Sequence, residues 1–436
     1  MKIAVVGSGI AGMGAALALS ETHEVWLLEA NTRFGGHANT VEVEGPDGPV
    51  PVDTGFIVYN TENYPHLTSL FRHLEVPTQA SDMSFGVSIR GGAREYAFDT
   101  LNEIFAQRLN LLRPRFVRMV LDILRFNREG RAALAGGGFD GLSLGDWIAK
   151  NGYGRDLVEG FLAPMGGAIW STPAAEMLDF PAENFVTFFR NHGLMNGMEP
   201  GHQWRTVSGG SREYVRRLLA KLGPRAQAGV AVTRIDRRGG RPLLRFADGE
   251  EMGFDQVVLA CHGPDAAALL ADGDAQERAI LGAFRTTPNR AILHSDAQLM
   301  PKRRRVWSSW NFLTDGTDGA RPAQVTYWMN RLQGIRRDLP LFVSLNPGRE
   351  PDPATVLGEW SYAHPYFDHA AFAGQRDIEA IQGRGGVWYA GAWLGYGFHE
   401  DGLRSGLRVA AALGATPDWA GAPIEPIHTP ILEAAE

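Results

Sequence analysis

The chain opens on a short apolar run, Ile3 to Val6, of the kind that is buried on both faces in a parallel sheet. This run passes through Gly7-Ser8-Gly9 into a helical pattern near Gly12, and a second apolar run, Val25 to Leu28, follows. Strand, glycine turn, helix and strand in this order predict a βαβ unit and an α/β fold class.

The middle of the chain has two different patterns. The sequence after Leu101 is mostly helical in its spacing, with a break at Pro114 and a glycine-rich turn at 136–138. Strand-like runs separated by loops follow later, at 291–294, 306–312 and 324–329. We therefore expect a second, mixed region in which helices cover a sheet.

The segment near 101–134 is basic as well as amphipathic. Its apolar residues recur at three- and four-residue spacing, and seven arginines stand against three acidic residues. The arginines are Arg108, Arg113, Arg115, Arg118, Arg125, Arg128 and Arg131, and a second basic cluster occupies 302–305. Such a helix is either a solvated face over a packed one or a peripheral contact with an anionic membrane. The sequence leaves both interpretations open.

Composition narrows the class of protein. A chain of 436 residues is long enough for two domains, and its net charge of −7 argues against a nucleic-acid partner. The single cysteine, Cys261, excludes an internal disulfide. No metal-ligand spacing and no apolar run of spanning length is present, and Lys2 leads directly into the first strand. We expect a cytoplasmic location with peripheral association at the inner membrane, and a homo-oligomer is left open.

The glycines of the first turn predict a dinucleotide site. Gly7 permits the tight turn that carries Ser8, Gly9 lets a pyrophosphate approach the backbone, and Gly12 lets the helix pack closely on the strand. The helix N-terminus presents free N–H groups to the phosphates. Glu29, at the end of the second apolar run, is placed to accept hydrogen bonds from ribose hydroxyls.

The residues that follow resemble the flavin amine oxidase and phytoene desaturase superfamily. The resemblance lies in Arg33-x-Gly35-Gly36, Val52 to Phe56, Val207 to Ser211, Val230 to Val232, Gln256 to Ala260 and two closing blocks, Trp388 to Gly391 and Gly397 to Gly406. It implies that FAD is the cofactor and that Arg33, Gly35, Gly36, Gly55, Val232, Gly391, Gly402 and Leu403 also bind it. The chain departs from the pattern at His37 and Ala392, where an arginine and an acid are usual. Because Cys261 lies far along the sequence from the closing blocks, we expect the FAD to be non-covalent.

The same resemblance implies how the domains are arranged. A Rossmann-like FAD-binding domain of the GR2 type is expected from residues 1–80, 205–285 and 385–420. A substrate domain of sheet and helix is expected from residues 81–204 and 286–384, interleaved with the first. Residues 421–436 are expected to form a tail.

Several middle segments resemble a bacterial branch of this superfamily. They include Ala260-Cys261-His262, Asn289-Arg290-Ala291, Met300-Pro301 and Trp307-x-Ser309-Trp310-Asn311. The branch contains FAD-dependent desaturases that act on methyl-branched acyl chains of phospholipids during furan fatty acid biosynthesis. The resemblance therefore implies an oxidoreductase whose substrate is a phospholipid acyl chain held in an apolar tunnel.

Two alternatives remain open from the sequence. Amine or polyene oxidation is one, although the strand at 287–294 has no lysine of the amine oxidase kind, and Trp393 and Tyr396 are the aromatic pair available to enclose an amine. A flavin-binding protein without turnover is the other.

For the base that takes a proton from the substrate, the candidates are His294, His262 and Glu400, with His399 beside the last.

Overall fold

The computed structural model describes residues 1–170, 173–195, 202–237, 240–315 and 324–427. A five-stranded parallel sheet forms the dinucleotide domain, in the order β10-β2-β1-β14-β20. Its strands are β1 (Lys2–Val6), β2 (Glu24–Glu29), β10 (Ala226–Ala228), β14 (Gln256–Leu259) and β20 (Val387–Tyr389). The strands come from three separate stretches of the chain, and the α/β fold class is confirmed.

Both faces of this sheet are covered. Ile3 and Val5 pack on the side of α1 (Ile10–Ser20), α10 (Arg212–Leu222) and α15 (His399–Ala412). Ala4 and Val6 pack on the other side, against α11 (Gly263–Leu269), α12 (Ala275–Gly282) and the antiparallel strands β11 (Val232–Asp236), β12 (Leu243–Phe246) and β13 (Glu251–Gly253). The continuous apolar run at the start of the chain is explained by this burial on two faces.

Two boundaries differ from those expected. Ile378 and Ile381, in η7 (Ile378–Ile381) after α14 (His369–Asp377), are buried in the core beside the parallel sheet, although residues up to 384 were assigned to the substrate domain. Ile424 and Ile427 pack partly buried on the dinucleotide domain, so the tail predicted from 421 does not begin there. The last part of that predicted tail, 428–436, lies outside the described residues.

The second domain is built on a seven-stranded sheet in the order β19-β15-β18-β17-β16-β7-β8. Its strands are β7 (Phe85–Ile89), β8 (Arg94–Ala97), β15 (Arg285–His294), β16 (Trp310–Thr314), β17 (Gln324–Trp328), β18 (Phe342–Leu345) and β19 (Val356–Tyr366). All neighbours are antiparallel except β16 and β7. In the long β15–β19 pairing, Ala291 lies opposite Trp360, and on its other side β18 places Leu345 opposite the same residue.

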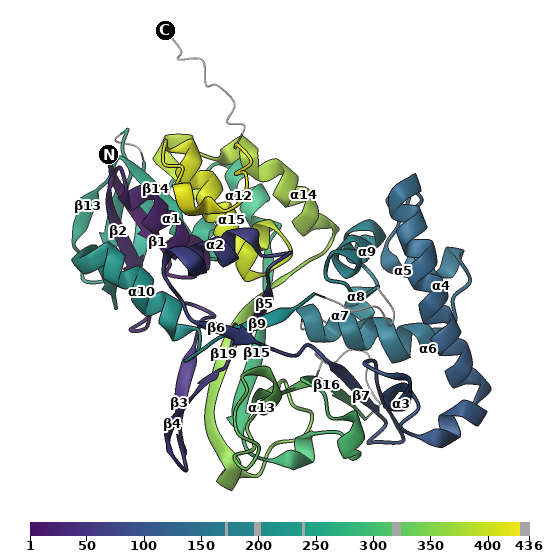
Figure 1. The fold of residues 1–436 in the computed structure, drawn as a ribbon. Helices are drawn as coiled ribbons and strands as arrows, with labels where there is room; N and C mark the ends of the chain where they lie inside the picture. Colours follow the sequence, from purple (N-terminus) through teal and green to yellow (C-terminus); the bar gives the residue numbers. More distant parts are fainter. Residues whose placement is uncertain (171–172, 196–201, 238–239, 316–323, 428–436) are drawn as a thin grey trace.

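Helices cover the outer part of this second sheet and stand apart from the parallel sheet (Figure 1). They are α3 (Leu101–Ile104), η1 (Arg108–Leu112), α4 (Pro114–Gly136), α5 (Leu144–Lys150), α6 (Arg155–Leu157), η2 (Val158–Leu162), α7 (Ala163–Trp170), α8 (Ala174–Met177) and α9 (Ala182–Asn191). Helix α4 starts at the predicted break, Pro114, and ends at Gly136, followed by the C-cap Gly137, whose φ of 73° is left-handed. Within the described part of the chain, no helix is both long and apolar enough to span a bilayer.

Short strands and one buried carboxylate join the two domains. The small sheet β5-β9-β6, formed by Val58–Asn60, Trp204–Val207 and Thr78–Ala80, lies between them (Figure 1). The hairpin β3 (Thr40–Gly45) and β4 (Gly48–Asp53) packs on the core of the second domain. Asp53 accepts hydrogen bonds from the Ser211 backbone N–H at 2.9 Å and from the Ser211 hydroxyl at 2.7 Å. Gln333, from the second domain, donates to the same carboxylate at 3.0 Å.

Candidate cofactor and substrate cavity

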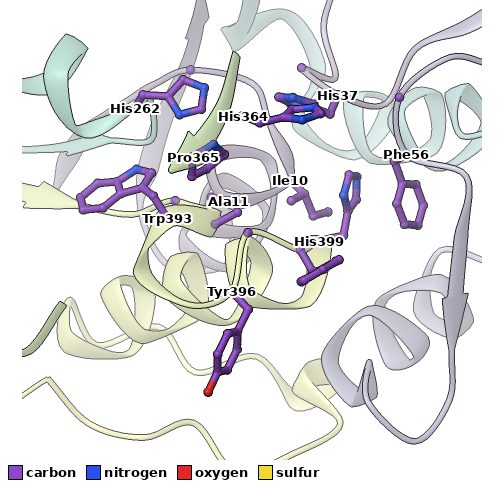
Figure 2. Close-up of a pocket in the computed structure, with 18 of the residues that line it drawn as sticks. Ile10, Ala11, His37, Phe56, His262, His364, Pro365, Trp393, Tyr396 and His399 are labelled. Carbon is purple, nitrogen blue, oxygen red and sulfur yellow. The ribbon is translucent and has the colours of Figure 1, made fainter. Parts of the chain in front are cut away.

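One cavity of about 720 Å³ runs from the carboxyl ends of the parallel strands into the second domain. Its dinucleotide end is lined by Val6 to Ala11 and Leu28 to Asn31. Its distal end is lined by side chains of the second domain, among them Phe85, Met165 and Trp310. Cavities at the carboxyl ends of parallel strands are the usual ligand sites of such sheets. Figure 2 shows some of the residues that line this cavity.

The glycine turn has the geometry that a dinucleotide requires. Gly7 has a φ of 103° and its N–H donates to the Leu28 carbonyl, so the turn is closed onto β2. A Cβ on Gly12 would lie 1.9 Å from the Gly7 carbonyl oxygen, which explains why the helix can pack on this turn only through glycine. A Cβ on Gly9 would meet no atom within 4 Å, because Gly9 borders the cavity. The roles predicted for the three glycines agree with this geometry.

Glu29 lines the cavity at the end of β2 and is held by two polar neighbours. One carboxylate oxygen accepts the Ser8 hydroxyl at 2.7 Å, and the other accepts the Asn31 backbone N–H at 2.9 Å. Although burial raises the pKa of Glu29, these hydrogen bonds lower it below its ordinary value. Glu29 is therefore an ionised acceptor beside the turn, as a ribose-binding acid needs to be.

The second glycine pair packs against the first turn. Gly36 has a φ of 56° and a Cβ there would lie 3.1 Å from Gly9 Cα, so Gly36 reaches the cavity wall beside Gly9. The Gly35 N–H donates to the Ser8 carbonyl at 3.1 Å. Arg33 is exposed, and its guanidinium donates to the Gly36 and Ala38 carbonyls. Arg33 is absent from the cavity lining, so it positions the loop rather than bordering the cofactor space directly.

The later predicted cofactor residues divide into two groups. Gly55, Val232 and Gly391 line the cavity. Gly402 and Leu403 do not, because α15 turns them toward α1: a Cβ on Gly402 would lie 2.9 Å from Ile10, and fully buried Leu403 packs over Gly14. The residues of this block that reach the cavity are Gly397, Phe398 and His399, one turn earlier. Gly402 and Leu403 are therefore predicted cofactor residues that do not line the cavity.

The described residues fit FAD on three observations. No side chain caps the N-terminus of α1, whose first turn borders the cavity, so its N–H groups remain for phosphate. Gly9 and Gly36 leave room for it at the turn. His37 also lines the cavity, and its buried Nε2 has no hydrogen-bond partner among the described residues, which a bound cofactor would supply.

Histidines gather around the middle of the cavity. His37 and His364 lie side by side with ring centroids 5.4 Å apart, and His399 stacks on Phe56 at 3.7 Å (Figure 2). Burial lowers the pKa of His364 to about 4 and that of His399 to about 3. Burial and the neighbouring histidines hold the pKa of His37 well below its ordinary value. These rings are therefore neutral at physiological pH, and their lowered pKa values make each of them a weaker base than a free imidazole. In the described part of the chain, no group of three or more potential ligands is arranged to hold a metal ion.

The three residues predicted for proton transfer lie in three different places. His262 lines the cavity at the N-terminus of α11, and burial lowers its pKa, although Asp265 opposes this. His294 is fully buried away from the cavity lining, with Nε2 2.8 Å from the Ser344 hydroxyl. The expectation that His294 faces the cofactor is wrong, because its strand end points into the packed sheet.

Glu400 is also absent from the cavity lining. Its two carboxylate oxygens accept hydrogen bonds from the backbone N–H groups of His66 and Leu67, each at 2.9 Å. These residues lie in the first turn of α2 (Pro65–His73), so Glu400 caps a helix. The prediction that Glu400 reaches the reacting atoms is wrong for this reason.

The predicted aromatic pair does not form. Trp393 packs on Phe284 with centroids 4.3 Å apart and donates to the Cys261 carbonyl at 2.9 Å, whereas Tyr396 packs toward Phe188 at 5.8 Å. In Figure 2 the two side chains extend in different directions.

Cys261 itself lies closer to the closing block than its place in the sequence suggested. It lines the cavity beside Gly7, where a Gly7 Cβ would lie 3.3 Å from the Cys261 nitrogen. Burial raises the pKa of the Cys261 thiol to about 12, and Asp265 adds to this. A protonated thiol at the phosphate turn disfavours a covalent link to the flavin ring, and non-covalent attachment of FAD stays a prediction.

The distal half of the cavity is apolar and aromatic. Its lining includes Met83, Phe85, Met165, Ile169, Trp170, Phe188, His192, Leu194, Trp204, Trp310, Tyr327, Pro365 and Phe367. The two carboxylates of the lining, Glu29 and Asp265, belong to the dinucleotide half, and no lysine or arginine of the described chain lines the cavity. The substrate half is therefore suited to an uncharged, apolar molecule.

Two cavity histidines were missed by the sequence reasoning. His364 belongs to β19, a strand that was not predicted, and His192 follows the end of α9, where Nδ1 lies 3.0 Å from the Phe188 carbonyl oxygen. Burial lowers the pKa of His192 to about 4. Nothing in the local sequence marks either position, because both reach the cavity through the packing of distant elements.

Comparison with known proteins gives a family match and several similar folds. The family described as flavin-containing amine oxidoreductase matches residues 10–414. The fold is similar to that of a fatty acid isomerase from P. acnes, with a TM-score of 0.66, 16% identity and coverage of 93% of this chain and 96% of that one. Wild-type putrescine oxidase bound to putrescine gives a TM-score of 0.67 at 15% identity, covering 95% and 99%. Cyclohexylamine oxidase from Brevibacterium oxydans gives 0.67 at 14%, covering 94% and 98%. At these identities the structures show a shared fold, and the family match shows that the cofactor is FAD.

Proposed function

The chain belongs to the flavin-containing amine oxidoreductase family and is an FAD-dependent oxidoreductase, and we propose that it desaturates a methyl-branched fatty acyl chain of membrane phospholipids, as in furan fatty acid biosynthesis. The observation that carries this proposal is the distal half of the cavity, whose walls are apolar and aromatic without a charged side chain. An acyl chain needs such a tunnel, whereas an ammonium group would be desolvated there without a carboxylate partner.

The reaction requires one acceptor for a hydride and one for a proton. FAD, when bound, supplies the hydride acceptor at its N5 atom. The hydride leaves one acyl carbon with its electron pair and a proton leaves the adjacent carbon, so a carbon–carbon double bond forms between them. Where the proton leaves the vinylogous carbon instead, the existing double bond shifts and a conjugated diene forms. A methyl branch beside an existing double bond favours this step, because allylic C–H bonds are weaker and more acidic than those of a saturated chain.

Among the cavity histidines, His399 is our first choice as proton acceptor. It lies at the junction of the two halves: its own ring stacks on Phe56 of the dinucleotide domain, and the preceding residue, Phe398, stacks on Phe188 of the substrate half at 5.1 Å. His399 Nε2 lies 3.2 Å from the Tyr214 hydroxyl oxygen. With Nε2–H donated to that oxygen, Nδ1 is the nitrogen left to take a proton.

Proteins of similar fold act on both kinds of substrate. One of the similar structures is a fatty acid isomerase, and two others are a putrescine oxidase and a cyclohexylamine oxidase. The fold alone therefore does not choose between a lipid and an amine. The charge of the lining favours the lipid, because both of its carboxylates lie at the dinucleotide half.

The test is a single-turnover experiment without oxygen, in which reduction of the bound flavin is measured as a loss of flavin absorbance. We expect a phospholipid with a methyl-branched, unsaturated acyl chain to bleach the flavin, and we expect putrescine and saturated straight-chain phospholipid to leave it oxidised. Bleaching by the amine and not by the lipid would establish the amine oxidase alternative. A flavin that no lipid, amine or polyene reduces would indicate a flavin-binding protein without turnover.

A further inference from the structure

Exposed leucines are concentrated in one region of the surface. Of the ten large hydrophobic residues that are exposed within the described ranges, six lie between positions 101 and 124. Leu109 and Leu112, in η1, are 66% and 79% exposed, and Leu121 and Leu124 on α4 are each more than half exposed. Single exposed leucines are ordinary, but this many in one short stretch indicate a surface that meets another apolar phase.

The outer face of α4 carries apolar residues and arginines without an acid. Its exposed residues are Pro114, Arg115, Arg118, Leu121, Leu124, Arg128, Arg131, Ala132, Ala135 and Gly136. The two acidic residues of the helix do not belong to this face. Asp122 is buried, and Glu129 is half-buried and forms an ion pair with Arg125, with 3.0 Å between Oε1 and Nε. The face is therefore positive along its length, although the chain as a whole has a net charge of −7.

Several of these arginines are free to bind something outside the chain. Arg115 pairs with Asp156 at 2.9 Å and Arg128 lies 3.5 Å from Glu129. Arg113, Arg118 and Arg131 are exposed and make no ion pair with any described residue, although Arg113 donates to the Asn110 amide oxygen at 3.1 Å. Arginines whose charge is not paired within the protein can bind external anions.

The second basic cluster, residues 302–305, lies beside the start of this surface. The Gly92 carbonyl accepts hydrogen bonds from Gln107, which immediately precedes η1, at 3.3 Å and from Arg303 at 3.2 Å. Buried Glu95 pairs with Arg303 at 2.8 Å, whereas Arg304 lies over the Trp307 ring and Arg305 is exposed. Two basic segments that are almost two hundred residues apart in sequence therefore meet at one turn.

We propose that these elements form a docking surface for an anionic lipid bilayer, composed of the exposed leucines of η1 and α4, the arginines between them and residues 302–305. Arginines bind the headgroup phosphates while the leucines enter the boundary with the acyl chains. Nucleic acid would satisfy the arginines but leave the leucines in water. Helix α4 lies at the edge of the molecule remote from the parallel sheet, so a flat partner can reach it (Figure 1).

The proposal deepens the proposed function, since a phospholipid substrate resides in a bilayer. It is tested without turnover, by sedimentation with vesicles of phosphatidylglycerol that carry unbranched chains, and with phosphatidylcholine vesicles as the neutral reference. The two proposals can therefore fail separately. If the protein binds vesicles but does not desaturate lipid in detergent micelles, only the proposed function is wrong. If it desaturates lipid in micelles but does not bind vesicles, only the docking surface is wrong.

The first variant replaces Arg113, Arg118 and Arg131 by glutamine. Each basic residue near an anionic surface strengthens binding roughly fivefold, so the triple variant should bind phosphatidylglycerol vesicles about 100-fold more weakly. A matched control removes the same charge elsewhere, by replacing exposed Lys221, Arg234 and Arg337 with glutamine, and should bind within about twofold of the unmodified protein. Flavin content and the thermal unfolding temperature are measured for both variants to check that they fold.

A second variant tests the leucines. Leu109→Gln with Leu112→Gln should weaken vesicle binding about tenfold or more while its salt dependence remains, and Leu357→Gln, an exposed leucine of β19, is the control. Equal binding of the arginine variant and its control would overturn the proposal, as would equal binding to neutral and anionic vesicles. Concentration-dependent self-association that is lost in the leucine variant would also overturn it, because the surface would then bind a second copy.

Discussion

The carboxylate of Glu400 accepts a hydrogen bond from the backbone N–H of Leu67 at 2.9 Å, across 333 positions of sequence. Its other oxygen accepts the N–H of the preceding residue, so Glu400 closes the open N-terminus of α2 from the first turn of α15. Both helices pack in the core of the dinucleotide domain. The residue therefore stabilises the domain that holds FAD instead of acting on the substrate.

The ionisation of Glu400 should be visible in the stability of the protein. Burial raises the pKa of Glu400 to about 7, above its ordinary value of 4.5. The stabilising effect of this raised pKa is complete below about pH 4.5 and is lost as the pH rises through 7, and it amounts to about 3 kcal/mol. Glu400→Gln should flatten the decrease of the unfolding free energy between pH 5 and 7, measured by denaturant titration.

The same variant separates a capping role from a catalytic one. We expect flavin reduction in the Glu400→Gln variant to remain within about twofold of the unmodified rate, because the residue does not line the cavity. A hundredfold loss of the reduction rate with unchanged stability would return Glu400 to the catalytic group.

A second prediction concerns Gly9 and Gly12. Gly9 has a φ of −64° and open space at its Cβ position, so Gly9→Val should fold normally but place two methyl groups where the pyrophosphate lies. We expect FAD content to decrease at least tenfold while the apoprotein unfolds cooperatively.

Gly12→Val is the contrasting variant for this experiment. Its Cβ would lie 1.9 Å from the Gly7 carbonyl oxygen, so the protein itself should be lost. Full FAD occupancy in the Gly9 variant, measured by absorbance after denaturation, would show that the cofactor lies elsewhere.

The cofactor half of the site was largely predictable because its chemistry depends on local backbone geometry. Gly7, Gly9 and Gly12 each serve a turn or a close approach within one βαβ unit, and this requirement is written in a few consecutive residues. The fold class followed from the same unit and from apolar runs that are buried on both faces of the sheet. Sequence spacing is sufficient evidence in such cases.

The proton-transfer residues were less predictable because they depend on which way a strand or helix end faces. His294 and His364 lie on the neighbouring strands β15 and β19, but the first faces the packed sheet and the second faces the cavity. Gly402 and Leu403 lie one turn too late to reach the cavity, because the rotation of α15 is set by its packing on α1. Tertiary packing fixes these orientations, and it leaves no mark in a single local motif.

A third prediction tests the attachment of FAD. The Cys261 thiol lies at the phosphate turn, and burial raises its pKa to about 12. Acid denaturation should therefore release all the flavin into the supernatant, and Cys261→Ser should bind the same amount of FAD. Flavin that stays with the precipitated chain, and is released by this substitution, would contradict the prediction.

The last prediction compares two histidines that the sequence could not distinguish. His399→Asn should slow anaerobic flavin reduction by methyl-branched phospholipid by ~10²–10⁴-fold, because the ring nitrogen that takes the proton is removed. His294→Asn is the matched control: its ring bonds to Ser344 within the sheet, so the variant should unfold at a lower temperature and reduce flavin at a nearly unchanged rate. Tyr214→Phe removes the hydroxyl beside His399 Nε2 and should give an intermediate loss of rate with normal FAD content. If the His294 variant loses the reduction rate and the His399 variant keeps it, the proton does not pass through the cavity histidine at the junction, and His262 becomes the next residue to substitute, since it also lines the cavity.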